Sequence, residues 1–196
     1  MTLYDWIESL PPVSQDTEWD TVFSQTSSPF SNESSGKLTA FLEECVSISG
    51  ISNYINELLP ALLTSGIPEA ALTQFLDFSK SYQKKFKNSF NWSHSNTKAL
   101  VHVFGRSHFL ATRLKRNPEL ALKLLESSFL FQKKNLLEME KGLRQRLENQ
   151  PNQSLSEFKT ALRCFKYEEF LRITVRDLAE LCPFEETLEE LSSVAI

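Results

Sequence analysis

The sequence predicts an all-α protein, an irregular multi-helix bundle with a long central helix near its C-terminus. The chain has 196 residues but only five glycines and eight prolines, and it is rich in Leu, Glu, Lys and Ser, a composition typical of helical proteins. Apolar residues recur at spacings of three and four along most of the chain after Lys37, as they do on one face of an α-helix. No alternating run of β-branched residues exceeds about four positions, so no strand is expected.

The composition excludes several functional classes. A net charge of −4 argues against non-specific nucleic-acid binding, which needs a basic surplus on some face. Cys45, Cys164 and Cys182 are far apart and show no C-x-x-C spacing. We therefore expect neither a disulfide framework nor a zinc site, but a protein of the reducing cytoplasm. Asp5 and Glu8 stand where a signal peptide would carry basic residues, and no window approaches the ~18 consecutive apolar residues of a membrane span.

Residues 1–36 are predicted to form a short helix followed by a polar, Ser-rich linker. The apolar stripe of that helix consists of Leu3, Trp6, Ile7 and Leu10. The Pro-Pro pair at positions 11 and 12 ends it. Residues 13–36 are interpreted as a surface linker because serines dominate their second half. Within the linker, Trp19, Val22 and Phe23 fit a short docked helix.

Residues 37–196 are predicted to form one helical domain. Its first three apolar stripes lie within residues 38–45, 51–62 and 71–86. Gly50 separates the first two, and Gly66 followed by Pro68 suits the end of one helix and the start of another. Residues 88–96 are polar apart from two aromatics and are expected to be a loop, in which Ser95 or Asn96 caps the next helix.

The middle of this domain is predicted to contain three more helical segments. Residues 99–104 form a short apolar face that Gly105 ends, and residues 107–116 form a second helix. Asn117, Pro118 and Glu119 provide the cap, the first-turn proline and the acid of a new start. The helix before the last linker has an apolar face made of Leu136, Met139, Leu143 and Leu147, and it ends near residues 149–152.

The longest helix is expected to run from a capping box at Ser154 and Glu157 to about Cys182. Its apolar residues change face along its length. One stripe consists of Leu155, Phe158, Leu162 and Phe165, and the other of Tyr167, Phe170, Thr174, Leu178 and Leu181. A helix that is apolar on two sides packs on two sides, so we place it centrally in the bundle. Pro183 starts a final helix, whose apolar residues are Phe184, Leu188, Leu191 and Ala195.

No residue is predicted to be catalytic, to bind a cofactor or to hold a metal. Metal-assisted nucleotidyl transfer needs paired carboxylates, and the nearest spacing is Asp16, Glu18 and Asp20. These acids lie in a polar linker with no Gly-rich loop before them, so we interpret them as solvated. The cysteines are interpreted as buried and inert. The three histidines share no metal-ligand spacing and are interpreted as structural or surface residues; they are His94, His102 and His108.

Three arginines lie on the long helix, where not all of them can be fully solvated: Arg163, Arg172 and Arg176. A doubly packed helix leaves little room for solvated guanidinium groups, so some of them should form partly buried ion pairs. The candidate partners are Asp177, Glu169 and the acids of the last helix. The alternative is a contact surface for a neighbouring domain. Pairs at i, i+4 spacing that support single helices are Glu140 with Arg144 and Glu168 with Arg172.

Two stretches carry recognisable motifs. Residues 104–125, FGRSHFLATRLKRNPELALKLL, contain a Phe-Gly-x-Ser turn followed by an Arg-x-Pro-Glu type start. Residues 161–195, ALRCFKYEEFLRITVRDLAELCPFEETLEELSSVA, contain a denser pattern of Leu-Arg-x-Phe, Leu-Arg-Ile, Arg-Asp-Leu-Ala and Glu-Glu-Thr-Leu-x-Glu-Leu-Ser. Both resemble the helical region before the first nucleotidyltransferase domain of bacterial glutamine synthetase adenylyltransferase, the adenylyl-removing enzyme. The family-like region is therefore about residues 99–196.

The resemblance implies a role in regulating glutamine synthetase and nitrogen metabolism. Enzymes of that family have two catalytic halves, one that removes AMP from a glutamine synthetase tyrosine by phosphorolysis and one that adds it from ATP. Their metal-binding acids lie in a Gly-Lys-Leu-Gly…Ser-Asp-x-Asp type motif. We expect this motif to follow the stretch seen here, so that the chain is truncated before it and inactive by itself. Cys164 stands where the family often has a second basic residue.

These observations lead to the following expectations. The chain is a helical scaffold region of such an enzyme, without cofactors of its own, since ATP and Mg²⁺ are expected only for the full-length enzyme. Its partners are the catalytic remainder of the enzyme or glutamine synthetase, and neither nucleic acid nor a membrane. The alternatives are a free-standing helical interaction module or a non-functional remnant of the enzyme.

Overall fold

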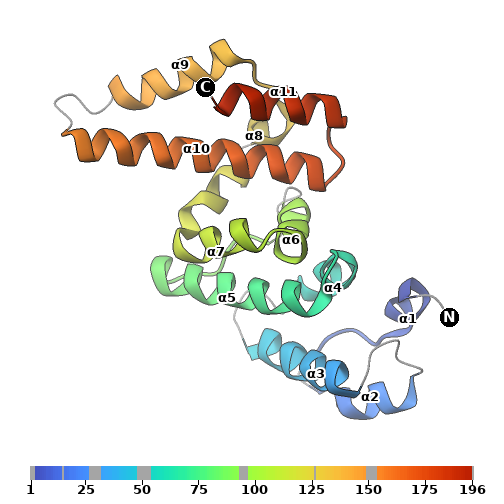
Figure 1. The fold of residues 1–196 in the computed structure, drawn as a ribbon. Helices are drawn as coiled ribbons and strands as arrows, with labels where there is room; N and C mark the ends of the chain where they lie inside the picture. Colours follow the sequence, from blue (N-terminus) through green and yellow to red (C-terminus); the bar gives the residue numbers. More distant parts are fainter. Residues whose placement is uncertain are drawn as a thin grey trace. The chain divides into compact units, whose positions relative to one another are not determined.

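The computed structural model describes residues 3–14, 16–26, 32–47, 54–92, 97–125, 127–148 and 154–195, and all regular structure in those ranges is helical (Figure 1). The predicted all-α class is therefore confirmed. None of the helices in this part of the chain is both long and apolar enough to cross a bilayer. Several expected features lie outside the described residues: the break at Gly50, the stripe residue Ile51, the caps Ser95 and Asn96, His94, and the helix end at 149–152.

The chain divides into two compact units, Met1–Glu119 and Leu120–Ile196. The boundary expected near residue 36 does not coincide with this division. The reason is that the N-terminal helices pack onto the rest of the first unit: α2 (Trp19–Gln25) contacts α3 (Asn32–Ser47), and α3 contacts α5 (Pro68–Phe86). The first 36 residues are thus part of a larger helical unit.

The N-terminal helices are held by a small aromatic cluster. Trp6 of α1 (Leu3–Ser9) is fully buried, and its ring centroid lies 5.8 Å from that of Phe23 on α2. Its indole N–H donates to the Thr26 hydroxyl at 3.2 Å. Trp19 packs on the same phenylalanine at 5.6 Å. The short docked helix expected around Trp19, Val22 and Phe23 is confirmed.

The predicted linker is too long, because α3 begins at Asn32 instead of Lys37. Its serine content suggested a loop, but helix propensity is weak and tertiary contacts override it. Ser34 and Lys37 both bind the Glu69 carboxylate of α5, at 2.6 and 3.2 Å, and hydrogen bonds from these two side chains lower the pKa of Glu69. Thr39, two residues after Lys37, donates to Asp20 of α2 at 3.1 Å.

Helices α4 (Ile55–Thr64), α5, α6 (Thr97–Arg106) and α7 (His108–Arg116) enclose an aromatic core. Phe75 and Phe78 of α5 are fully buried at its centre. Phe90 and Trp92 belong to the expected loop at 88–96, yet each is only 3% exposed. The Trp92 ring lies 4.7 Å from Phe75, and Phe90 meets Phe78 edge-on at 5.4 Å. The loop therefore contributes two residues to the core, which the sequence did not predict because their neighbours in the chain are polar.

Gly105 does not end α6, as the sequence suggested, because the helix continues to Arg106. Its role is to permit a close crossing with the end of α4. A Cβ atom at Gly105 would lie 2.5 Å from the Ser65 carbonyl oxygen and closer still to the Ser65 hydroxyl oxygen. The adjacent turn is also built on this contact: Gly66 adopts φ +115°, and the Ile67 amide donates to the Gly105 carbonyl at 3.3 Å. Only glycine fits at position 105, because a Cβ atom there would clash with Ser65.

The second unit is smaller and is built around α10 (Leu155–Leu178). Its other elements are the 3₁₀ helix η1 (Pro118–Leu125, which begins in the first unit), α8 (Ser127–Phe131), α9 (Leu136–Glu148) and α11 (Phe184–Ala195). Helices α8, α9 and α11 all contact α10, and α11 runs back along it (Figure 1). One apolar cluster of this unit consists of Met139, Ile173 and Val194, with Phe165, Phe170 and Leu191 packed against it.

The long helix differs from its prediction in extent and in packing. The capping box at Ser154 and Glu157 is confirmed, but the helix ends at Leu178 instead of near Cys182. Leu155 and Phe158, expected to be buried, are 69% and 41% exposed. Burial on several sides is confined to residues 169–176, where α8 and α11 pack. The helix is thus central only in its C-terminal half.

We predict that Gly105→Ala destabilises the first unit. Overpacking of this kind typically costs about 1–3 kcal/mol, and trimming the Ser65 side chain will not restore stability, because the carbonyl oxygen of Ser65 also blocks the Cβ. The measurement is urea unfolding followed by tryptophan fluorescence, since all three tryptophans lie in this unit. Gly36→Ala is the matched control: it lies within α3 with nothing near its Cβ position, so it should stabilise by about 0.5–1 kcal/mol. Equal effects at both positions would contradict the close crossing.

Candidate functional site

The most highly organised polar site in the described residues is a cluster of buried charges in the second unit. Arg172 and Arg176 of α10 are 0% and 4% exposed, and Glu169 and Glu190 are 3% and 1% exposed. Isolated charges are costly to bury, so such groups must be paired and hydrogen-bonded.

Arg172 uses all three nitrogens of its guanidinium group. Its Nε donates to Glu169 on the same helix at 2.9 Å, and its Nη2 donates to Glu190 of α11 at 2.6 Å. Its Nη1 donates to the backbone carbonyl of Gln132, in the segment that joins α8 to α9, at 2.9 Å. One planar guanidinium therefore connects three segments, as its fixed fork of donors allows.

Arg176, one helical turn later, repeats part of this pattern. Its Nη1 donates to Glu190 at 2.7 Å and to the Gln132 carbonyl at 3.2 Å. Its Nη2 pairs with Glu186 of α11. Glu190 thus accepts from both arginines, one on each carboxylate oxygen. Both arginines also share the Gln132 carbonyl.

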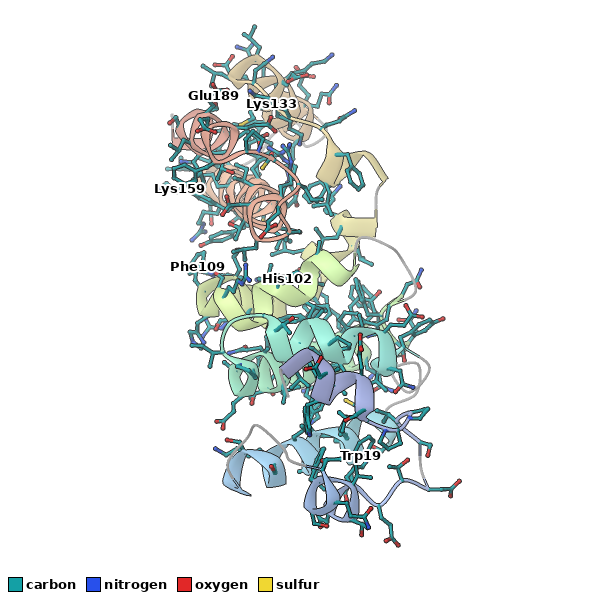
Figure 2. The ribbon with its side chains drawn as sticks, turned by 90° about the vertical axis from the view of Figure 1, so that its right-hand side faces the viewer. Trp19, His102, Phe109, Lys133, Lys159 and Glu189 are labelled. Atoms are coloured by element: carbon teal, nitrogen blue, oxygen red, sulfur yellow. The ribbon has the colours of Figure 1, made fainter. Side chains whose placement is uncertain are left out.

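The segment between α8 and α9 completes the cluster. The Lys134 amide donates to Glu190 at 2.8 Å, and its ammonium group pairs with Glu169 at 2.6 Å. The neighbouring Lys133 pairs with Glu189 on the exposed side at 2.6 Å, and this hydrogen bond raises the pKa of Lys133 (Figure 2). A segment without helical hydrogen bonds is in this way fixed against two helices.

The cluster is balanced in charge. Arg172, Arg176 and Lys134 oppose three carboxylates, those of Glu169, Glu186 and Glu190. The attraction between buried charges roughly offsets their lost hydration, so such a set contributes specificity of arrangement more than net stability. Removing one member is different, because the remaining charge stays buried without its partner.

A separate ion pair joins α9 to α10. Arg146 donates two hydrogen bonds to Glu168, both at 2.8 Å, and this bidentate pairing raises the pKa of Arg146. The i, i+4 pair expected between Glu168 and Arg172 is therefore wrong. Arg172 points into the unit towards Glu169 and Glu190, which leaves Glu168 to the neighbouring helix.

The expected ion pairs of Arg172 and Arg176 with Glu169 and with acids of the last helix are confirmed. Asp177, the other candidate, accepts a hydrogen bond from Thr187 at 3.1 Å. Arg163 is exposed and donates to the Lys159 carbonyl and to Thr160, both at 3.3 Å. The sequence did not reveal the part played by the Gln132 carbonyl and the Lys134 amide, because every residue carries such backbone groups.

The other sequence candidates do not converge on a site. Glu18 accepts from Thr21 and Asp20 from Thr39. His108 lies 3.1 Å from Gln74, and Cys45 is buried, which raises the pKa of its thiol. Within the described ranges, no three His, Cys, Asp or Glu side chains are arranged to hold a metal ion.

A groove of about 280 Å³ lies in the second unit between α9, α10 and α11. Its lining is mostly apolar. The apolar lining residues are Leu136, Met139, Leu143, Leu162, Phe165 and Val194. The groove continues the apolar cluster around Met139 and Val194, and its polar lining residues are Glu140, Lys166 and Ser193.

Comparison with known proteins decides the family. The family model described as "Glutamate-ammonia ligase adenylyltransferase" matches residues 97–196, which is more than half of the chain. The chain belongs to this adenylyltransferase family. The match includes both stretches that carry the sequence motifs and all of the buried charge cluster.

Two curated relatives agree with this assignment. The chain is 38% identical over 98 residues to the bifunctional glutamine synthetase adenylyltransferase/adenylyl-removing enzyme of Nitrosococcus oceani, and 31% identical over 96 residues to that of Hahella chejuensis. The matches cover 50% and 49% of this chain but only 10% of each relative. The chain thus spans about a tenth of the length of these adenylyltransferases. No solved structure matches it.

We predict that Arg172→Met destabilises the second unit by about 3–5 kcal/mol, since it leaves Glu169 and Glu190 buried without their shared partner. Urea unfolding followed by far-ultraviolet circular dichroism measures the loss. Arg163→Met, on the same helix but exposed, should change the free energy of unfolding by less than about 0.5 kcal/mol. If the two substitutions had equal effects, the cluster would not hold the unit together.

Proposed function

We propose that this chain is a helical support region of a glutamine synthetase adenylyltransferase/adenylyl-removing enzyme, and that it lacks the catalytic motif of the family. The observation that carries this proposal is the charge cluster around Arg172. It lies in the family-matched region, and its carboxylates are engaged by cations of the chain itself. A metal-holding site for nucleotidyl transfer would need such carboxylates turned towards an open face.

The proposed role is mechanical. Helices α10 and α11 and the segment around Gln132 form one braced body, because each is bound to the other two through Arg172. A braced body suits the support of a neighbouring domain, whose catalytic groups must be held to within a fraction of an ångström. In this proposal the chain acts in the cytoplasm, and its partner is the catalytic remainder of the enzyme or glutamine synthetase. ATP and Mg²⁺ bind only to that remainder.

A second candidate is a free-standing helical interaction module. It is favoured by the exposed apolar residues of the second unit, which include Phe131, Leu137, Leu155 and Phe184, each at least 64% exposed. The two candidates differ in what the chain does for catalysis. A support region restores the activity of an enzyme that lacks it, whereas a free-standing module does not.

The first experiment tests whether the chain is inactive alone. Purified chain is incubated with glutamine synthetase, ATP and Mg²⁺, and the intact mass of glutamine synthetase is measured. We expect no added AMP. Any stoichiometric adenylylation would contradict the proposed lack of a catalytic motif.

The second experiment tests support directly. In the Nitrosococcus oceani relative, the residues that match this chain are replaced by residues 97–196, and the adenylylation rate of the chimera is measured. We expect activity within about tenfold of the unmodified enzyme, and the same chimera with Arg172→Met should lose activity and thermal stability together. Full activity with Arg172→Met, or an inactive but stably folded chimera, would argue for the interaction module.

A further inference from the structure

The N-terminal half of α10 carries an apolar stripe that continues into the groove of the second unit. Leu155, Phe158, Leu162 and Phe165 follow one another at spacings of three and four residues, so they share one face of the helix. The first two are 69% and 41% exposed, and the last two line the groove of about 280 Å³. We call this combined surface the α10 groove. All of its residues lie in the second unit, so it is defined without reference to the first.

A basic border runs beside this apolar stripe. Lys159, Arg163 and Lys166 stand at i, i+4 and i+7 on α10, which places them together along one side of the apolar residues. Lys159 and Arg163 are exposed, and Lys166 lines the groove (Figure 2 labels Lys159). Within the part of the chain that the structure describes, neither lysine of this border forms an ion pair with a carboxylate. Their positive charge is thus open to an outside partner.

The C-terminal half of the same helix shows what kind of partner such a surface binds. There, α11 packs along α10, with Val194 in the shared apolar cluster. Glu186 and Glu190 of α11 pair with the basic side chains of α10, Arg172 and Arg176. Helix α11 is amphipathic and contains four glutamates but no lysine or arginine. The N-terminal half of α10 offers the same chemistry, apolar residues beside basic ones, and it therefore suits a second helix of the α11 type.

We propose that the α10 groove is a docking site for an acidic amphipathic helix of another protein. Apolar side chains of that helix, at i, i+3 and i+7 spacing, lie in the groove, as in other complexes of a helix with a groove. Its acidic side chains meet Lys159, Arg163 and Lys166, so that the charges on the two sides are complementary. This inference goes beyond the supporting role, since it holds whether or not the chain braces a catalytic domain.

Three other occupants fit this surface less well. A groove of about 280 Å³ is small beside the roughly 300–1,000 Å³ of small-molecule sites, so it suits anchoring side chains better than a whole ligand. A second copy is disfavoured, because an antiparallel pair of α10 helices brings the two basic borders together and like charges repel. A lipid bilayer needs its apolar side chains on a protruding face, whereas half of this stripe lies in a groove between three helices.

The test measures the binding of synthetic peptides to the whole chain by fluorescence anisotropy. The probe is a fluorescein-labelled peptide of roughly three heptads, with Leu at positions a and d and Glu at e and g, because the glutamates prevent it from pairing with itself. A matched peptide carries Lys in place of every Glu. The surface is smaller than a standard interface, so we expect a dissociation constant on the order of 10–100 µM for the acidic peptide. The basic peptide should bind at least about tenfold more weakly.

Apolar variants locate the site. Leu155→Ala with Phe158→Ala removes the exposed half of the stripe and should weaken binding of the acidic peptide at least about fivefold. Leu137→Ala is the matched control, because Leu137 is 74% exposed on α9 but does not line the groove. It should leave binding unchanged. Equal losses in the two variants would place the peptide elsewhere and overturn the proposal.

Charge reversal provides the decisive measurement. Lys159→Glu with Lys166→Glu should weaken binding of the acidic peptide at least about tenfold and strengthen binding of the basic peptide by a similar factor, a gain that also shows the variant to be folded. Lys141→Glu with Arg144→Glu, on the exposed face of α9, changes the net charge equally and should alter neither affinity.

Several outcomes would overturn the proposal. They are equal binding of the two peptides, no binding of the acidic peptide at a chain concentration of about 300 µM, and binding of anionic lipid vesicles or self-association of the chain without binding of the acidic peptide. None of them bears on the supporting role, which the activity of the chimera tests.

Discussion

The pairing of Arg172 with Glu190 is the interaction on which the second unit depends. Each nitrogen of this fully buried guanidinium donates a hydrogen bond, and the three acceptors lie on three separate segments. Glu190 in turn accepts from Arg176 and from the Lys134 amide. Apolar side chains are buried in the same unit, among them Met139, Leu171, Ile173, Val175 and Val194. The charges add to the definition of this packing, because their geometry tolerates fewer alternatives than apolar contacts do.

This arrangement bears on function because its carboxylates, the groups that could bind a metal ion, are paired with cations of the same chain. Carboxylates bound by arginines of the same chain hold helices in register and are poor ligands for a metal. In the proposed function, this stretch braces the enzyme and the catalytic groups lie in another part of it. Residues 97–196 match the family model and also contain every member of the cluster.

Much of the fold could be predicted from the sequence, since helical periodicity, prolines and capping residues act locally. The capping box at Ser154 is an example, and so is the restart at Pro183. The predictions were wrong where a contact with a residue far away in the sequence determines the local structure. The sequence suggested that Gly105 ends a helix. It lies within α6, and the position requires glycine because Ser65 lies too close for a side chain. Leu155 and Phe158 were expected in the core, yet both side chains are largely exposed.

The charge cluster could be predicted only in part, because contacts with distant segments decide which residues belong to it. Three arginines on a helix expected to be doubly packed indicated buried ion pairs, and the acids of the last helix were the natural candidates. The choice between Arg163 and the other two depended on which turns of α10 are covered, which the sequence alone does not specify. The participation of the segment around Gln132 left no signal at all, since it contributes backbone groups.

The most direct test of this account is amide hydrogen exchange at Lys134. This residue lies in a segment without helical hydrogen bonds between α8 and α9, where an amide would ordinarily exchange rapidly with solvent. The account predicts strong protection, close to that of the buried half of α10, because the Lys134 amide donates to the buried Glu190 carboxylate. Exchange at the rate of an exposed loop would contradict the claim that the charge cluster holds the unit together.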